Sequence, residues 1–353
     1  MEFCTLTEKE FSEFESKNVY GNIMQTVERS KLRALMGFSC HLLGVKENNA
    51  VVAAALMVEK NREAWIQIGP ILDFDNTKLL KFFLENVQKY CREQKFTELE
   101  IFPPLLYRLR DAHGEVTKEF KRKKVFDCFE ALGFQHLGFT EKTEYKALRW
   151  MFVKDLTGCN DIRDIELTFD PTRRKRFHRA ERDLEVYQLE DKSELKVWIE
   201  GLQDSDKRNG LNTRNLQYFE DMWDCYGDKA MFLEAKRKET GEIVACEVDI
   251  WHENELVTFL SGIPAEFRKE NGMTAIKGWQ MERCLERKIY RLNMYGIEGN
   301  FSGNNSLLTT KKDFGGYVEE YIGGFKIILN PFGFYMGKIS RKFASLKKKV
   351  FKK

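Results

Sequence analysis

The sequence predicts an α/β protein with mixed sheets, in which one structural unit occurs twice. Each half shows the apolar alternation of a β-hairpin and a further strand, followed by a long amphipathic helix and another strand. Corresponding positions keep a separation of 193 residues, so that Gly69 matches Gly262, Leu99 matches Leu292 and Phe102 matches Tyr295. A register kept over about sixty residues favours duplication over a coincidence of common elements.

The first half begins with two helices, and a capping box from Thr7 to Glu10 opens the first of them. Asn48 and Asn49 supply a hairpin turn between two strands, and Asn76 caps the long helix. Helices are expected at 7–17, 26–36 and 76–93, and strands at 40–45, 51–59, 64–69 and 97–102.

The second half repeats this order after a basic helix at 172–183, which Asp170 and Pro171 open as N-cap and first residue. Strands are expected at 230–238, 243–251, 256–261 and 290–295, with a helix at 271–287. A chain of 353 residues favours two domains. We place the first at 1–150 together with 330–353, and the second at 151–329.

Composition excludes several classes of protein. The eight cysteines contain no C-x-x-C pair and the five histidines are scattered, so neither a disulfide framework nor a zinc site is expected. No Ser-His-Asp or Cys-His arrangement is visible, and we expect no metal and no cofactor. The N-terminus has no basic segment followed by an apolar segment, as a secretory signal peptide would, and the apolar stretches are too short to cross a bilayer. We therefore expect a cytoplasmic protein.

Charge is unevenly distributed, although the net charge is only +3. Residues 321–353 contain nine Lys or Arg and no Asp or Glu, which leaves 49 basic against 55 acidic residues in 1–320. Within this tail, Ile339, Phe343, Leu346 and Val350 form one apolar stripe at helical spacing. A basic amphipathic helix predicts peripheral contact with an anionic membrane surface. The alternative is that the stripe packs on the first domain.

The helix at 172–183 is strongly basic, through Arg173, Arg174, Lys175, Arg176 and Arg179. Such density is typical of a surface that binds phosphate backbones. A solvated helix face explains the same pattern equally well.

A further helix is expected after Gly210, capped by Asn212 or Thr213, with Arg214 in its first turn. A cation there opposes the helix dipole, and a bound phosphate would relieve the conflict. Lys311 is expected near the end of another helix, where a lysine is ordinary.

Six segments in chain order, covering nearly the whole sequence, resemble motifs of the FemABX family of peptidoglycan aminoacyltransferases. The most specific is Lys311 to Gly324, KKDFGGYVEEYIGG, which resembles K-K-x-F-G-G-x-x-x-E-Y-I-G. The others are Gln25 to Phe38, Gly69 to Asp73, Arg173 to Val186, Thr213 to Phe219 and Tyr295 to Ile297. Only Glu220 to Lys229 separates the motif at Thr213 to Phe219 from the next strand, so the chain resembles the compact FemX and MurM-type members, which have no helical hairpin there.

The resemblance implies two tandem GNAT-like domains and transfer of an aminoacyl group from tRNA to an amine of a peptidoglycan stem peptide. It implies that the first domain binds the precursor, either UDP-MurNAc-pentapeptide or its lipid-linked form, and that the second faces the aminoacyl-tRNA. By position, Arg33 and Arg214 would bind phosphate, Tyr218 would contact the substrate, and Lys311 would act in the transfer step.

Two positions depart from the family pattern. Phe102 stands where an Asp is often discussed as a base, and Leu260 stands where a substrate-contacting Tyr is found. The identity of the proton acceptor is therefore open.

Two other functions compete with this one. An acyl-CoA-dependent N-acyltransferase needs an R/Q-x-x-G-x-G/A loop for the CoA diphosphate, and the nearest segments, Gly69 to Leu72 and Arg268 to Ala275, have the wrong spacing. A non-catalytic nucleic-acid or membrane binder would explain the basic segments but not the KKDFGG motif.

Overall fold

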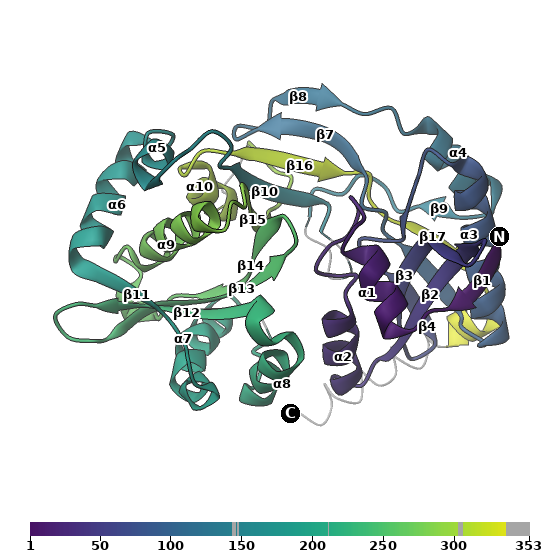
Figure 1. The fold of residues 1–353 in the computed structure, drawn as a ribbon, viewed down its shortest axis with the longest axis horizontal. Coiled ribbons are helices and arrows are strands. Elements are labelled where there is room, and N and C mark those ends of the chain that lie inside the picture. The colour runs from purple at the N-terminus through teal and green to yellow at the C-terminus, as the bar shows by residue number, and fades with distance from the viewer. Residues whose placement is uncertain (143–145, 147, 211, 303–305, 337–353) are drawn as a thin grey trace. The chain divides into compact units, whose positions relative to one another are not determined.

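The computed structural model describes residues 1–142, 146, 148–210, 212–302 and 306–336 (Figure 1). The chain forms two compact units that exchange segments. Of the described residues, unit 1 contains those in 1–105, 121–139 and 322–336, and unit 2 contains those in 106–120 and 140–321. Residues 106–120, 140–142 and 148–150 thus belong to the second unit and 322–329 to the first, which differs from the expected boundaries at 150 and 329.

Unit 1 is a mixed sheet with strand order β1-β2-β3-β4-β6-β17-β9, and β5 pairs with β3. The sheet is antiparallel except between β4 and β6, whose parallel register joins Glu63 with Glu98 and Ile66 with Ile101. Its strands are β1 (Glu2–Thr5), β2 (Ser39–Glu47), β3 (Ala50–Lys60), β4 (Glu63–Ile66), β5 (Ile71–Leu72), β6 (Glu98–Ile101), β9 (Gln135–His136) and β17 (Phe325–Ile328), and its helices are α1 (Glu8–Glu15), α2 (Val27–Leu35), α3 (Thr77–Glu93) and α4 (Lys123–Ala131).

Local sequence explains these elements. Thr7 Oγ1 accepts from the Glu10 backbone and the Glu10 carboxylate accepts from the Thr7 backbone, which confirms the predicted capping box. Asn48 and Asn49 both adopt positive φ, 49° and 65°, as a tight hairpin turn requires. Asn76 caps α3, whose side chains at Leu80, Phe83 and Val87 are fully buried against the sheet.

Unit 2 is a second mixed sheet, with strand order β11-β12-β13-β14-β15-β10-β16-β7-β8. Helices α6 and α9 cover one face of the β11–β14 region and α7 and α8 the other (Figure 1). Its strands are β7 (Leu106–Asp111), β8 (Val116–Glu119), β10 (Trp150–Asp155), β11 (Leu184–Gln188), β12 (Ala230–Arg237), β13 (Ile243–His252), β14 (Glu255–Gly262), β15 (Arg291–Gly296) and β16 (Tyr317–Tyr321). Its helices are α5 (Ile162–Glu166), α6 (Pro171–Asp183), α7 (Leu195–Arg208), α8 (Leu216–Tyr226), α9 (Gly272–Glu286) and α10 (Ser306–Lys312), with short 3₁₀ turns η1 (Lys192–Glu194), η2 (Gly227–Lys229) and η3 (Ala265–Phe267).

The predicted repeat is confirmed by the two topologies. The series β2-β3-β4-α3-β6 in unit 1 has the same order and strand directions as β12-β13-β14-α9-β15 in unit 2. In both, the two strands that flank the long helix are parallel neighbours. The described residues contain no helix long and apolar enough to cross a membrane. The predicted tail helix from Gly337 onward lies outside the described residues.

Candidate active site

The side chain of Lys311, a residue of helix α10, reaches the end of strand β15. Its Nζ donates a hydrogen bond to the Gly296 carbonyl at 2.8 Å and lies 3.4 Å from the Tyr295 carbonyl. Both carbonyls follow Asn293, the last residue of β15 that pairs with β14. Lys311 is therefore held beyond the point where these two parallel strands stop bonding to each other.

The surroundings of Lys311 change its acidity. Burial and, to a smaller extent, the nearby Lys277 ammonium lower the pKa of Lys311 to about 7, against the opposing effect of the Glu247 carboxylate. A lysine with such a pKa exists in both charge states near neutral pH. Its ammonium form can donate to a developing oxyanion and its neutral form can take a proton. Spacing in the sequence indicated only an ordinary helix-terminal lysine.

A buried polar network packs between α9 and the sheet. Lys277 Nζ donates to Glu247 Oε1 at 2.6 Å, to Thr258 Oγ1 at 2.8 Å and to Gln280 Oε1 at 3.0 Å. The Gln280 amide also contacts Glu247 and Asp249. Burial, with the neighbouring Glu247 charge, raises the pKa of Asp249 well above its usual value and favours its protonated form. This network was not predicted from the sequence, although Glu247 and Asp249 at alternate positions of an apolar strand are a visible signal.

The residues after Lys311 form a tightly packed turn. Phe314 is buried, and the Arg173 guanidinium lies 4.4 Å from its ring centre. Gly315 and Gly316 adopt φ of 70° and 144°. A Cβ at Gly316 would lie 2.4 Å from the Val153 carbonyl oxygen. Only glycine fits both the backbone conformation and this close approach, which explains the two glycines of the KKDFGG motif.

Arg214 lies before helix α8, not in its first turn. The expected caps, Asn212 and Thr213, are wrong: Asn215 is the N-cap, and its Oδ1 accepts from the Tyr218 backbone at 3.1 Å. The predicted conflict between Arg214 and the helix dipole is therefore absent. The Arg214 guanidinium instead lies 5.3 Å from the centre of the Tyr218 ring, and it forms no ion pair with any residue that the structure describes.

Asp206 on α7 is a further residue of this region that the sequence analysis missed. It is buried, and the charge of Arg214 acts on its carboxylate. No motif identifies it, because its position beside Arg214 depends on how α7 packs against the segment that precedes α8.

Arg33 belongs to unit 1, where it is buried in helix α2. Its Nη2 lies 3.5 Å from Gln67 Oε1, and its guanidinium lies 5.1 Å from the Phe38 ring centre. Phe102 is a core residue of the same unit, packed so closely on Gly324 that a Cβ there would lie 2.4 Å from the Phe102 ring. Phe102 offers no proton acceptor, as the sequence indicated.

Helix α6 divides its basic residues between an inner and an outer side. Arg173 is buried and donates to Thr274 Oγ1 at 2.9 Å and to the Thr310 carbonyl at 3.1 Å, so its guanidinium is engaged within unit 2. The outer side exposes Lys175, Arg176 and Arg179, which form no ion pair with other described residues.

The acidic residues of α6 do not neutralise these three cations. Glu181 pairs with Arg163 at 2.7 Å, and Asp183 pairs with Arg182 at 2.7 Å. Arg174 donates to the Leu167 carbonyl. The exposed cations at 175, 176 and 179 therefore have no ion-pair partner among these acids.

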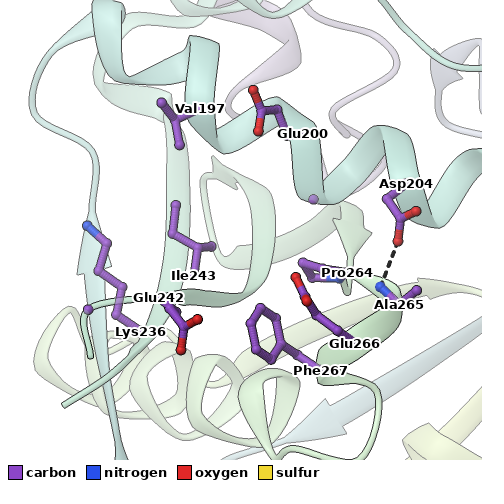
Figure 2. A pocket seen from close by; sticks show the side chains of 12 residues that line it. Val197, Glu200, Asp204, Lys236, Glu242, Ile243, Pro264, Ala265, Glu266 and Phe267 are labelled. Carbon is purple, nitrogen blue, oxygen red and sulfur yellow. Dashed lines mark hydrogen bonds between the residues drawn. The ribbon is translucent and has the colours of Figure 1, made fainter. Parts of the chain in front are cut away.

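A separate pocket of about 740 Å³ opens beside α7 and the start of η3 (Figure 2). Its lining includes the carboxylates of Glu200, Asp204, Glu242 and Glu266, and none of the predicted site residues. Asp204 accepts from the Ala265 backbone at 2.7 Å, which fixes the loop that leads to α9 (Figure 2). An acidic pocket disfavours anionic ligands.

The repeated mixed sheets, with a lysine held where two parallel strands separate, define a protein of the tandem acyltransferase class. The chain belongs to the FemAB family, whose model matches residues 6–238 and 232–342. It is 24% identical to aminoacyltransferase FemA of Staphylococcus epidermidis, over 99% of this chain and 100% of FemA. The chain is accordingly an aminoacyltransferase.

Solved structures support the same fold. The crystal structure of FemX has a TM-score of 0.79 at 17% identity, covering 94% of this chain and 98% of FemX. A tandem GNAT protein from the clavulanic acid biosynthesis pathway has a TM-score of 0.57 at 12% identity, covering 94% of this chain and 99% of that protein. The expected GNAT-like architecture and the expected family are thus confirmed.

Proposed function

We propose that this aminoacyltransferase moves an amino acid from an aminoacyl-tRNA to an amine on the stem peptide of a peptidoglycan precursor. The observation that carries the proposal is Lys311, held by the Gly296 carbonyl at the end of β15 with a pKa near neutrality. Family membership supports the precursor as acceptor, because the chain is similar to FemA, FemB and FemX and resembles the FemABX family of peptidoglycan aminoacyltransferases.

The reaction joins an amine to an activated ester. The amine nitrogen attacks the ester carbonyl, a tetrahedral oxyanion forms, and the bond to the ribose oxygen of the tRNA then breaks. In its ammonium form Lys311 stabilises the oxyanion, which is the charge that develops only in the transition state. We propose that Arg33 and Arg214 each bind phosphate of the precursor and that Tyr218 contacts the substrate.

The exposed cations of α6 support tRNA as the donor. Lys175, Arg176 and Arg179 form no ion pairs in the described structure, so they are available to a phosphate backbone without breaking an internal bond. In this proposal unit 2 faces the aminoacyl-tRNA and unit 1 contributes to precursor binding.

The structure gives a reason to reject acyl-CoA as the donor. The loop before α9, where such enzymes bind the CoA diphosphate, borders the acidic pocket that contains Glu266. Gly272 at the start of α9 is packed on β13, where a Cβ would lie 2.6 Å from the Ala245 Cβ. Negative charge and close packing both disfavour a diphosphate at this helix terminus.

We further propose that the protein is cytoplasmic and that its C-terminal end contacts the inner face of the membrane, so that the lipid-linked precursor is the natural acceptor. Phe332, Tyr335 and Met336 are exposed on one helical turn, 331–336, immediately before the basic tail. Truncation after Pro331 should abolish sedimentation with anionic vesicles but leave use of a soluble UDP-linked acceptor. Failure of the full-length protein to sediment at low salt would favour the soluble precursor.

Muropeptide masses test the function in cells. Muropeptides purified from cells that contain this protein should include species heavier by one amino-acid residue, and cells without it should lack them. Identical muropeptide profiles would refute the proposed function.

A further inference from the structure

Asp206 is a buried carboxylate without a partner. The residue is only 8% exposed and lies on the face of α7 that also buries Trp198 and Leu202. Within the described residues its side chain makes no hydrogen bond and no ion pair, and its Oδ2 is fully covered. Burial raises the pKa of Asp206, and the charge of Arg214 only partly opposes this.

The other buried acids of the described chain are all engaged. Their partners are Lys326 for Glu98 and Glu100, Arg163 for Glu166, Lys236 for Glu234, Lys277 for Glu247, Gln280 for Asp249, Arg291 for Glu319 and Arg110 for Glu320, and Glu15 also has an interaction. Burying a carboxylate without a partner is costly, and such groups concentrate at functional sites.

The surroundings of Asp206 show what could bind there. Gln203 Nε2 donates to the Arg214 carbonyl at 3.1 Å and so ties the segment before α8 to helix α7. The Arg214 guanidinium packs on Tyr218 and forms no ion pair with Asp206. Burial and the Glu247 charge raise the pKa of the Cys246 thiol on β13, and the Asp206 charge contributes to this rise. Opposite charges that are near each other but not bonded suit a ligand that carries both an ammonium and an anionic group.

We propose that Asp206 binds the ammonium group of the acceptor and takes its proton, while Arg214 binds an anionic group of the same molecule. This assignment rests on the proposed function and supplies the proton acceptor that Phe102 cannot provide. It makes Asp206 a catalytic residue.

The acceptor ammonium gives one proton to the Asp206 carboxylate, which leaves a free amine and a neutral carboxylic acid. The amine nitrogen forms a bond to the ester carbonyl carbon, and the bond from that carbon to the ribose oxygen breaks. The second proton lost by nitrogen goes to the departing ribose oxygen, and Asp206 returns its proton to water.

The stability of Asp206→Asn separates this role from a structural one. Asn has nearly the same shape but removes the buried charge, so the melting temperature of the variant should rise while its activity falls. A group kept for function at a cost in stability behaves in this way. Asp228→Asn is the matched control, because Asp228 is exposed in the same unit; its melting temperature and activity should not change.

Two further measurements identify the amine as the bound group. At pH 7 the kcat/KM of Asp206→Asn should be lower than that of wild type by a factor of about 10² to 10⁴. The ratio of the variant kcat/KM to the wild-type kcat/KM should rise about tenfold per pH unit, because the free amine replaces the missing base. By calorimetry at pH 7, wild type should bind UDP-MurNAc-pentapeptide more tightly than the same precursor acetylated on its stem-peptide amine. The Asp206→Asn protein should bind the two equally.

Failure of the role of Asp206 can be distinguished from failure of the proposed transfer reaction. If wild type transfers nothing from aminoacyl-tRNA, the proposed function fails, yet the amine preference and the melting temperature still decide the role of Asp206. An Asp206→Asn protein that keeps the amine preference, or that melts at a lower temperature, overturns the inference. A kcat/KM ratio that is the same at every pH also overturns it.

Discussion

Replacing Lys311 with alanine should lower kcat by about 10² to 10³, which corresponds to about 3 to 4 kcal/mol, as for the loss of one oxyanion donor. KM for the precursor should change little, because the oxyanion exists only in the transition state. The assay is steady-state transfer from labelled aminoacyl-tRNA. Lys312→Ala is the matched control, since it makes the same change one residue further along α10 and should keep kcat.

The pKa of Lys311 gives this prediction a second test. If the ammonium form is active, kcat should fall as pH rises through about 7, where burial has brought the pKa of this side chain. Lys311→Arg keeps its charge throughout this range, so its profile should lack that fall. An unchanged kcat in Lys311→Ala, or an unaltered profile in Lys311→Arg, would remove Lys311 from the mechanism.

The same shift predicts a pH-dependent stability. Because the folded-state pKa of Lys311 lies below the unfolded-state value near 10.5, the unfolded state binds more protons between about pH 7 and 10.5. The free energy of unfolding should therefore rise with pH across this window, and the rise should be smaller in the Lys311→Met variant. Melting temperatures at pH 6 and pH 9 measure the difference. Equal pH dependence in both proteins would show that the lysine is not buried in solution.

Three further sets of substitutions test the remaining assignments. Arg214→Ala should raise KM for the precursor about 10- to 100-fold, as expected for a lost charge-assisted hydrogen bond, and Arg33→Ala should do likewise while Arg33→Lys is mild; normal KM in both alanine variants would refute the phosphate assignment. Phe102→Ala should lower the free energy of unfolding by about 3 to 5 kcal/mol without the pH-dependent loss expected of a base, measured by urea denaturation and a pH–rate profile. Charge reversal at Arg176 and Arg179 should weaken aminoacyl-tRNA binding and reduce its salt dependence, and unchanged binding in a filter assay would exclude α6 from the tRNA surface.

Features set by short segments could be predicted from the sequence. Thr7 and Glu10 form their capping box within four residues, and Asn48 and Asn49 form their turn with no help from elsewhere. The position of α8 was harder, because several possible caps precede it and tertiary packing selects Asn215.

Features set by long-range contacts could not be predicted. The hairpin β7–β8 packs with unit 2 because β7 pairs with β16, about 200 residues later in the chain. Asp206 has no motif, and its isolation is visible only once α7 is placed. The residues of the site were found by resemblance, but their protonation states depend on burial that the sequence does not reveal.

Purified protein mixed with charged tRNA and a peptidoglycan precursor provides the most direct test of the central claim. We expect a product heavier than the precursor by one amino-acid residue, formed with aminoacyl-tRNA, abolished by prior RNase treatment, and absent with acetyl-CoA. A precursor that is left unchanged by every charged tRNA but becomes acetylated with acetyl-CoA would contradict it.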